Sequence, residues 1–362
     1  MNITYISLGG LVEVEKYRYL YFVIMLTVYV FIICSNSTVV CLIVIHKNLH
    51  EPMYIFIAAL LINSVLFSTN IYPKLLIDFL SEKQMISYQA CLLQIFSFYA
   101  LTCSEFLLLA AMSYDRYVSI CKPLQYPTIM RTKNVGILLF LAWLVPACHI
   151  AVPVIGNANP KLCSFTLQGI FCNNSLNNLF CVNSKALLTY GLVVLFNLAL
   201  LPLLFILFTY TNILIIAYKS CGEVRKKAAQ TCVPHLLALV NYSFLVTYDM
   251  IIVRMDSDFP KTARFVMTMQ IITCNPLFNP IIYGLKMKEI YKHLKGFFCQ
   301  AKLNLLSHSL SCSLIMMIVR RCEKTVLKWW LFISFYEHRK EMQRNILLQL
   351  STFVIDTQIL KI

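Results

Sequence analysis

The stretch that decides the fold is Met112-Ser113-Tyr114-Asp115-Arg116-Tyr117-Val118-Ser119-Ile120-Cys121, followed by Lys122-Pro123-Leu124-Gln125-Tyr126-Pro127. It closes an apolar run that begins near Cys91 and is long enough to cross a bilayer as a helix. An Asp-Arg pair at the end of such a run lies where lipid gives way to water, so its charges can be paired or solvated at small cost and can meet a soluble partner. The plainer interpretation is an interfacial pair that only extends toward the lipid headgroups.

The whole chain has the composition of a helical membrane protein. Of its 362 residues, 59% are hydrophobic and 13% are charged, which is more apolar side chain than a soluble domain of this length can bury. The apolar residues occur in runs of about twenty, the length that one membrane-spanning helix needs. The first run begins near Tyr19 and is too long for the core of a signal peptide, so we expect it to be an uncleaved first span.

The charge of the chain indicates membrane lipid, and not nucleic acid, as a partner. The formal net charge is +15, which in a membrane protein indicates basic cytoplasmic loops near anionic headgroups. The sequence contains no Gly-rich phosphate loop, no metal-ligand spacing and no zinc-type Cys/His cluster. No nucleophile faces a base across two of the apolar runs, so we expect no enzyme.

The apolar runs predict an all-α membrane protein with seven spans. We place six of them at about residues 19–45, 54–80, 91–116, 135–155, 186–218 and 262–285, and one more, before the last of these, that ends near residue 252. The following segment, residues 286–298, is amphipathic and basic, which suits a short helix that lies along the membrane surface.

Basic residues gather in alternate loops, which sets the orientation. The loops that we expect to be cytoplasmic hold Lys47, Lys122, Arg131, Lys133, Lys219, Arg225, Lys226, Lys227, Lys286, Lys288, Lys292 and Lys295. The other loops are poorer in Lys and Arg and also hold Glu82, Asp256 and Asp258. By the positive-inside bias, the N-terminus is expected outside the cell.

The stretch around Asp115 and Arg116 closely resembles the end of the third span in the olfactory branch of the rhodopsin-like G-protein-coupled receptors, which carries M-A-Y-D-R-Y-V-A-I-C-x-P-L-x-Y. This chain departs from that pattern by Ser113 and Ser119, both small. Further family motifs follow in the right order: L-H-x-P-M-Y at residues 49–54, K-A-x-x-T-C-x-x-H at residues 227–235, and an Asn-Pro motif at residues 276–283. The resemblance covers about residues 20–298.

The resemblance implies a seven-helix bundle with a short surface helix, divided into an extracellular N-terminus (1–18), a receptor domain (19–298) and a cytoplasmic tail (299–362). The tail has no counterpart in the family. It is a genuine extension, an interfacial segment or translated non-coding sequence, and we assign it no function.

The implied function is that of an odorant receptor in the plasma membrane, which binds a small odorant within the bundle and activates a heterotrimeric G protein of the cyclic-AMP-raising type. One alternative is a non-olfactory receptor of the same fold with another small ligand. A transporter is a weaker alternative, because the sequence has no internal repeat and Glu105 is the main charge in mid-membrane.

Activation is expected at the cytoplasmic ends of the spans. The resemblance implies that Arg116 pairs with Asp115 at rest, and that release of this pair opens a cavity for the G protein. The residues that the resemblance assigns to coupling and activation are Asp115, Arg116, Tyr117, Tyr210, His235, Asn279, Pro280 and Tyr283. For His235 the alternative is an ordinary interfacial histidine.

Four cysteines on the outer side are expected to form disulfides, since that compartment is oxidising. The resemblance implies that Cys91 pairs with Cys172, and that Cys163 pairs with Cys181; the alternative is free thiols. Sequons at Asn2 and Asn173 make these two residues potential glycosylation sites.

The ligand pocket is expected in the outer halves of the spans, where apolar residues mix with a few hydroxyls. The candidate residues are Phe98, Tyr99, Thr102 and Cys103 in the third span, Asn197 and Leu198 in the fifth, and Ser243, Val246 and Thr247 in the sixth. For each of them, plain packing is an equal alternative.

Glu105 is a carboxylate in mid-membrane, where an isolated charge is costly, so it needs a cation or polar partners. The resemblance implies a sodium ion between this Glu and an Asp of the second span. Here Ser64 occupies that Asp position, which weakens the site. We therefore keep two alternatives: sodium held by Glu105 with Asn36, Ser64 or Asn63, or a protonated Glu105 in a hydrogen-bond network. We expect no other cofactor.

Overall fold

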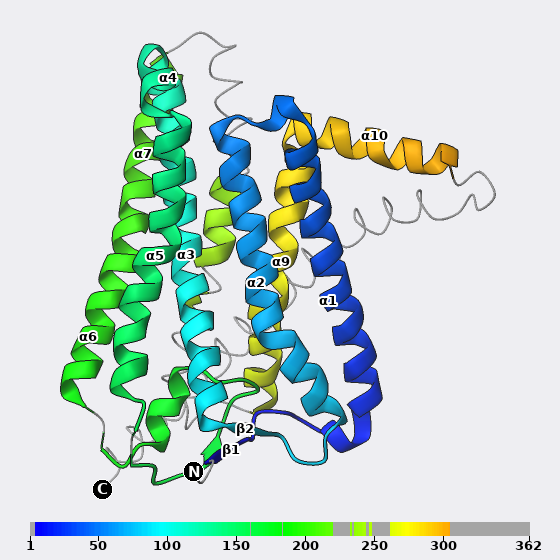
Figure 1. Ribbon diagram of the computed structural model, residues 1–362, viewed down its shortest axis with the longest axis vertical. Helices are drawn as coiled ribbons and strands as arrows, with labels where there is room; N and C mark the ends of the chain where they lie inside the picture. Colours follow the sequence, from blue (N-terminus) through cyan, green and yellow to red (C-terminus); the bar gives the residue numbers. More distant parts are fainter. Residues whose placement is uncertain are drawn as a thin grey trace, which may run out of the picture. The chain divides into compact units, whose positions relative to one another are not determined.

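The computed structural model describes residues 4–159, 161–182, 184–219, 232–233, 235–243, 246–247 and 261–304. Residues up to Lys295 belong to one compact unit, in which long helices run side by side (Figure 1). These helices are α1 (Val14–Ile45), α2 (Pro52–Leu80), α3 (Tyr88–Cys121), α5 (Thr132–Gly156), α6 (Lys185–Leu195), α7 (Leu201–Lys219) and α9 (Lys261–Lys286), and helix α10 (Lys288–Asn304) follows α9 in the chain.

Six helices among the described residues are long and apolar enough to cross a membrane, where Lys185–Lys219 is counted as one. They agree with six of the seven predicted spans. The remaining predicted span, the sixth in chain order, is described only in part. Of that span, residues 232–233, 235–243 and 246–247 are described, and all of them are helical.

Local chemistry explains where the helices begin and end. Pro52 occupies the first turn of α2, where a missing N–H costs nothing. Ser87 caps α3, because its Oγ accepts a hydrogen bond from the N–H of Ala90 at 3.4 Å. Pro123 ends α3, since the residue before a proline is kept out of the helical region, and Lys122 has φ −135° and ψ 53°. As a result, α3 is longer at both ends than the predicted span of residues 91–116.

The fifth predicted span is interrupted by a π-helical turn, η4 (Phe196–Leu200), between α6 and α7. Pro202 follows this turn and has no N–H with which to bond the carbonyl of Leu198. The turn contains Asn197 and Leu198, two of the predicted ligand residues. The sequence pattern did not predict it, because a π-turn leaves the apolar run unbroken.

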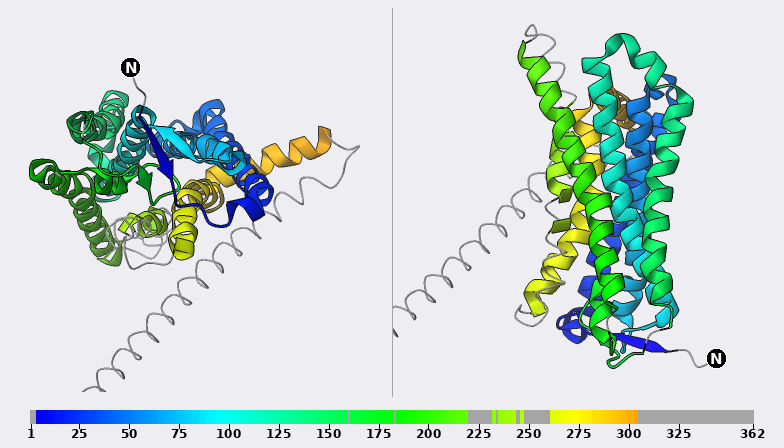
Figure 2. Two further views of the ribbon diagram at one scale, coloured as in Figure 1. Left: turned by 90° about the horizontal axis from the view of Figure 1, so that it is seen from below. Right: turned by 90° about the vertical axis from the view of Figure 1, so that its left-hand side faces the viewer.

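Helix α3 packs against α2, α5 and α7, while α1 packs against α2 and α9 (Figure 2). Buried apolar side chains form two clusters. One lies at the end of the bundle that carries the N-terminal strand, here called the sheet end. The other lies at the opposite end, called the α4 end after the short helix α4 (Tyr126–Ile129). A buried polar layer that includes Asn36, Ser64 and Glu105 lies between them.

A small sheet forms at the sheet end from segments that are remote in sequence. Strand β1 (Tyr5–Leu8) pairs antiparallel with β2 (Met85–Ser87) and parallel with β3 (Thr166–Leu167). Residues 1–18 were expected to form an extracellular N-terminus, and those that are described contain this strand and the start of α1. The sequence pattern missed the strand because its partners lie some 80 and 160 positions away.

Two disulfides hold the long loop after α5. Cys91 is joined to Cys172, with Cα atoms 5.4 Å apart, and Cys163 to Cys181, with Cα atoms 4.9 Å apart. These are the pairings that the resemblance implied. The first bond attaches the loop to the start of α3 across 81 residues of sequence.

The loop geometry does not favour the predicted glycosylation of Asn173. Its side chain is buried and caps the 3-10 helix η3 (Asn174–Leu179), where Oδ1 accepts hydrogen bonds from the N–H and the hydroxyl of Ser175. A buried, engaged amide has no room for a glycan. Asn2, the other predicted site, lies outside the described residues.

Replacing Cys172 with Ser should destabilise the receptor by roughly 2–5 kcal/mol, because the lost cross-link closes the longer of the two loops. Replacing Cys163 with Ser should cost less, since that bond spans 18 residues. Thermal unfolding of the purified receptor measures the difference, and peptide mapping without reduction checks the pairing. A free Cys172 in receptor that reaches the cell surface and responds to ligand would contradict the assignment.

Candidate functional site

The α4 end of α3 carries a buried ion pair. Arg116 donates from Nε to Oδ2 of Asp115 at 2.9 Å, and its Nη2 contacts the same oxygen. Asp115 is fully buried and Arg116 nearly so. The expected pair is therefore present. Because both charges are buried, each depends on the other, and removal of one partner would leave an uncompensated charge.

Tyr126, the first residue of α4, hydrogen-bonds to this pair. Its hydroxyl donates to Oδ1 of Asp115 at 2.9 Å, so both carboxylate oxygens accept hydrogen bonds. Burial, followed by the nearby Asp115 carboxylate, raises the pKa of Tyr126 above its ordinary value, which keeps the hydroxyl protonated as a donor. Tyr117, also predicted here, is half-buried, with the Lys122 ammonium 6.0 Å from its ring centre.

Three further predicted residues are buried in the same end of the bundle. Nδ1 of His235 lies 3.4 Å from the hydroxyl of Tyr283, and their ring centres are 5.5 Å apart. Tyr210 is buried in the same apolar cluster as Tyr283. Within the described residues, Nε2 of His235 and the hydroxyl of Tyr210 have no hydrogen-bond partner. These polar atoms are therefore available to a new partner after a rearrangement of the helices.

Glu105 is bound by two asparagines of α9. Its Oε2 accepts a hydrogen bond from Asn275 at 2.8 Å, and its Oε1 accepts one from Asn279 at 2.9 Å. Asn279 also donates to Oγ of Ser64 at 3.0 Å. Glu105 is buried, so these bonds replace the water that a carboxylate would otherwise require. The network joins α2, α3 and α9.

Asn36 and Asn63, two of the possible sodium ligands, also make hydrogen bonds to neighbouring groups. Asn36 donates to the carbonyls of Ile32 and Pro276, at 2.8 and 3.0 Å. Asn63 donates to the carbonyl of Leu101 at 3.1 Å, and its Oδ1 accepts from Trp143 at 3.3 Å. Asn36 thereby links α1 to α9 beside Pro276.

The polar layer contains buried amide oxygens that no donor of the described residues satisfies. Within the described residues, Oδ1 of Asn275 and Oδ1 of Asn36 are buried without a hydrogen-bond partner. Together with the Glu105 carboxylate, they offer oxygen ligands with a single formal negative charge. No group of three His, Cys, Asp or Glu that could hold a metal ion occurs in the described part of the chain.

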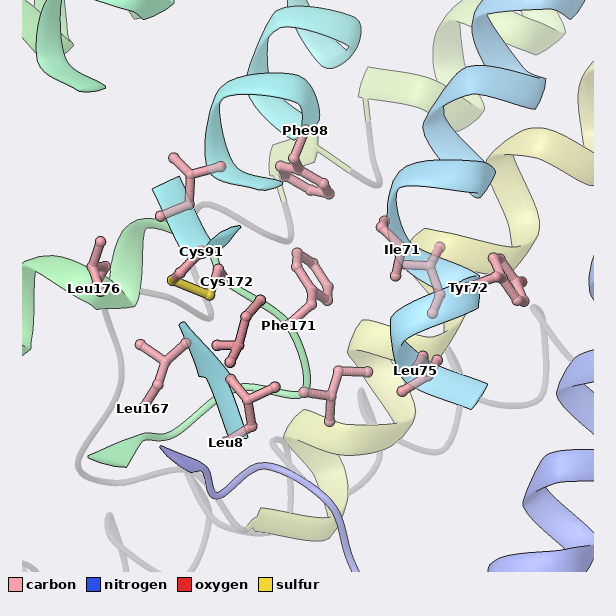
Figure 3. Packing of buried hydrophobic residues seen from close by; sticks show 14 of the residues in the cluster. Leu8, Ile71, Tyr72, Leu75, Cys91, Phe98, Leu167, Phe171, Cys172 and Leu176 are labelled. Carbon is pink, nitrogen blue, oxygen red and sulfur yellow. A yellow bond between two sulfur atoms is a disulfide. The ribbon is translucent and has the colours of Figure 1, made fainter. Parts of the chain in front are cut away.

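Phe98, the foremost predicted ligand residue, lies among aromatic rings at the sheet end. Its ring centre is 5.3 Å from that of Phe67 and 5.0 Å from those of Tyr99 and Phe171. Figure 3 shows Phe171 projecting from the disulfide-bonded loop toward Phe98. Phe171 was not among the predicted ligand residues, because it lies in a loop that reaches α3 through the Cys91–Cys172 bond and contacts formed only in the folded protein.

Only some of the other predicted ligand residues lie in the same cluster as Phe98. Tyr99 and Leu198 are buried in the sheet-end cluster, and Cys103 packs against it half-buried. Ser243, whose buried Oγ has no partner within the described residues, is half-buried like Asn197. In contrast, Val246 packs against the α4-end cluster and Thr247 is exposed.

Tyr242 is a site residue that the sequence analysis did not select. Its hydroxyl donates to the carbonyl of Thr102, and its ring centre lies 4.8 Å from that of Phe106. It thereby connects the described part of the sixth predicted span with α3 at the level of a predicted ligand residue. Asn275 and Tyr126 are two more site residues that the sequence did not single out. For Asn275 the available signal was an amide side chain within an apolar run.

A cavity of about 200 Å³ opens beside β1 and is distinct from the predicted ligand residues. It is lined by Leu8, Gly9, Leu11, Val14, Glu15, Arg18, Ser81, Glu82, Gln84 and Lys261. None of the predicted ligand residues lines it, so this cavity does not bear on their assignment.

Comparison with known proteins identifies the family. The family described as "Olfactory receptor" matches residues 25–301. The chain is 34% identical to human olfactory receptor 10K2 over 292 residues, which cover 77% of this chain and 90% of the relative. It is 33% identical to mouse olfactory receptor 4B13, with 80% and 94% covered, and 34% identical to mouse olfactory receptor 5M5, with 80% and 92% covered. The chain therefore belongs to the olfactory receptor family, a family of multi-pass membrane receptors and not of enzymes.

Proposed function

We propose that this chain is an odorant receptor of the plasma membrane, which binds a small odorant within a seven-helix bundle and activates a heterotrimeric G protein of the cyclic-AMP-raising type. The observation that carries the proposal is the buried Asp115–Arg116 pair at the end of α3, closed by Tyr126, in a chain of this family. A buried ion pair at a membrane boundary is a two-state element, since its cation has one partner at rest and can take another when the helices separate.

The proposed topology has an extracellular N-terminus and seven spans. Residues 235–243 supply part of the additional helix between α7 and α9. Lys47, Lys122 and Arg131 stand at the α4 end, which favours the cytoplasm for that end. Helix α10 has Ile290 buried and Lys292 exposed, which suits a helix that lies on the inner surface of the membrane.

Ligand binding and G-protein activation would be coupled through α3. An odorant bound against Phe98 and Thr102 acts on the turn of α3 to which Tyr242 is hydrogen-bonded. Displacement of Tyr242 releases the outer contact of the sixth span and changes the packing at its other end, where His235 lies against Tyr283. Movement there lets Arg116 leave Asp115 and opens the α4 end to the G protein.

The polar layer would hold a sodium ion in the inactive receptor. Its ligands would be the Glu105 carboxylate, the free Oδ1 atoms of Asn275 and Asn36, and the Ser64 hydroxyl. A sodium ion bound there would supply the positive charge that lets Glu105 stay ionised. With only one carboxylate in the layer, binding is weak, and Glu105 is often protonated within its hydrogen bonds to the asparagines.

A panel of odorants applied to cells that express the receptor tests this function, with cyclic AMP as the readout. We expect a subset of small apolar odorants to raise cyclic AMP. A response only to ligands of another class would identify a non-olfactory receptor, whereas solute uptake without any cyclic-AMP response would identify a transporter.

Replacing Arg116 with Ala should abolish the cyclic-AMP response and leave odorant binding largely intact, because the guanidinium lies at the opposite end of the bundle from the ligand residues. The matched control is Arg131→Ala, which removes an exposed cation from the same end. An undiminished response of Arg116→Ala at equal surface expression would refute the role of this residue.

Replacing Ser64 with Asp should strengthen sodium binding by at least roughly tenfold, because a second carboxylate attracts the ion at short range. Basal cyclic AMP should then fall at lower sodium concentration than in the wild type. Glu105→Gln, which keeps the shape and loses the charge, should remove the sodium dependence. A strong sodium dependence in the wild type that Ser64→Asp does not increase would disprove this account.

Truncation after Asn304, where α10 ends, should leave the odorant response intact. All the motifs shared with the family precede that residue, and the family match ends at residue 301. Surface expression and cyclic-AMP output of the truncated and full chains provide the measurement. Loss of either would assign a function to residues 305–362.

A further inference from the structure

The N-terminal segment is built into the sheet end of the bundle by backbone hydrogen bonds on both of its edges. On one edge, the N–H of Leu8 donates to the carbonyl of Gln84 at 2.8 Å. On the other edge, the N–H of Ser7 donates to Phe165 at 2.8 Å, and that of Gly9 to Leu167 at 2.7 Å. A strand paired on both edges is held in one register, so this segment is an ordered part of the receptor.

The same segment inserts apolar side chains into the protein. Ile6 is fully buried, and Leu8 and Leu11 are nearly so. All three belong to the cluster that contains Phe171 and the predicted ligand residue Phe98. In Figure 3 the ring of Phe171 lies between Phe98 and the strand residue Leu8. The segment therefore packs in the same cluster as Phe98, on the other side of Phe171.

Two glycines allow the segment to approach the long loop. A Cβ atom on Gly10 would lie 2.4 Å from the carbonyl carbon of Gly169, and the N–H of Gly10 donates to the Gly169 carbonyl at 3.1 Å. No side chain fits between these backbones. The contact depends on the absence of a Cβ at Gly10.

The long loop is in turn attached to α3 by a disulfide and by hydrogen bonds. Besides the Cys91–Cys172 bond, Gln94 Oε1 accepts a hydrogen bond from the N–H of Cys172 at 2.9 Å, and the Tyr99 hydroxyl accepts one from the N–H of Asn174 at 3.0 Å. Strand, loop and helix are thus joined in one continuous chain of contacts that ends beside Phe98.

We propose that residues 5–11 form the roof of the odorant site, with Leu8 and Gly10 as positioning residues that hold Phe171 against Phe98 and close the route from outside to the ligand residues. The inference rests on the proposed function for the location of the odorant site. An odorant that arrives from the extracellular side then enters when this segment lifts, so the segment sets the rate of access.

Cys103 provides a reporter that needs no odorant. It is a free thiol among the predicted ligand residues and is half-buried. The probe is a cationic, membrane-impermeant methanethiosulfonate, applied outside intact cells that express the full chain. The measured quantity is the rate at which Cys103 is modified, determined by mass spectrometry, with Cys103→Ser as the blank.

The decisive comparison is Gly10→Ala against Gly191→Ala. Both add one methyl group, but a Cβ on Gly191 meets nothing within 4 Å, whereas one on Gly10 overlaps the loop backbone. Gly10→Ala should raise the modification rate by about tenfold, because overpacking of this kind favours the lifted segment. Gly191→Ala should match the wild type.

Leu8→Ala provides a second, milder variant if Gly10→Ala does not reach the cell surface, and it should raise the rate in the same direction. Equal rates in all the variants, or no Cys103-dependent modification in any of them, would overturn the proposal. The odorant panel is scored separately. If Gly10→Ala speeds modification of Cys103 but the receptor responds to no odorant, the covering role of residues 5–11 stands and the proposed function is refuted. If the receptor responds to odorants but the modification rates are equal, the proposed function stands and the covering role is refuted.

Discussion

The structure depends on the need to satisfy a carboxylate that is buried in the middle of the membrane. Glu105 is buried, its oxygens accept hydrogen bonds from Asn275 and Asn279 of α9, and Asn279 also donates to Ser64 of α2. In lipid an unsatisfied polar group costs several kcal/mol. The network therefore holds three helices together more selectively than apolar contacts can, because lipid tails compete with apolar side chains and cannot replace these hydrogen bonds.

Helix α3 carries this network at its centre, and each of its ends is held by a separate set of side-chain interactions. At the sheet end, the Cys91–Cys172 bond and Gln94 hold the long loop against the helix. At the α4 end, the Asp115–Arg116 pair is closed by Tyr126 of α4. A receptor needs a helix that contacts both its ligand and its intracellular partner, and α3 is the element on which the proposed sites for both are placed.

Much of this could be predicted from the sequence, and the failures have a common cause. Apolar runs located the six helices that are long enough to span a membrane, and the chemistry of Glu105 correctly required buried polar partners. The sequence did not identify the hydrogen-bond partners themselves: Asn275, which was not selected, and Asn279 bind Glu105, while Asn36, one of the possible sodium ligands, bonds to the carbonyls of Ile32 and Pro276. Which face of one helix meets which face of another depends on crossing angle and rotation, and a single apolar run does not encode these.

The sequence by itself determined the membrane class, the positions of most spans and the family, because length, hydropathy and short motifs are local properties. Only the tertiary structure decided the rest. Strand β1 exists because β2 and β3 lie on either side of it, and Gly10 matters because Gly169 comes within contact of it. These pairings join segments that are far apart in the chain. Their stabilising free energy comes from contacts that form only after the helices have assembled, so no local sequence pattern reveals them.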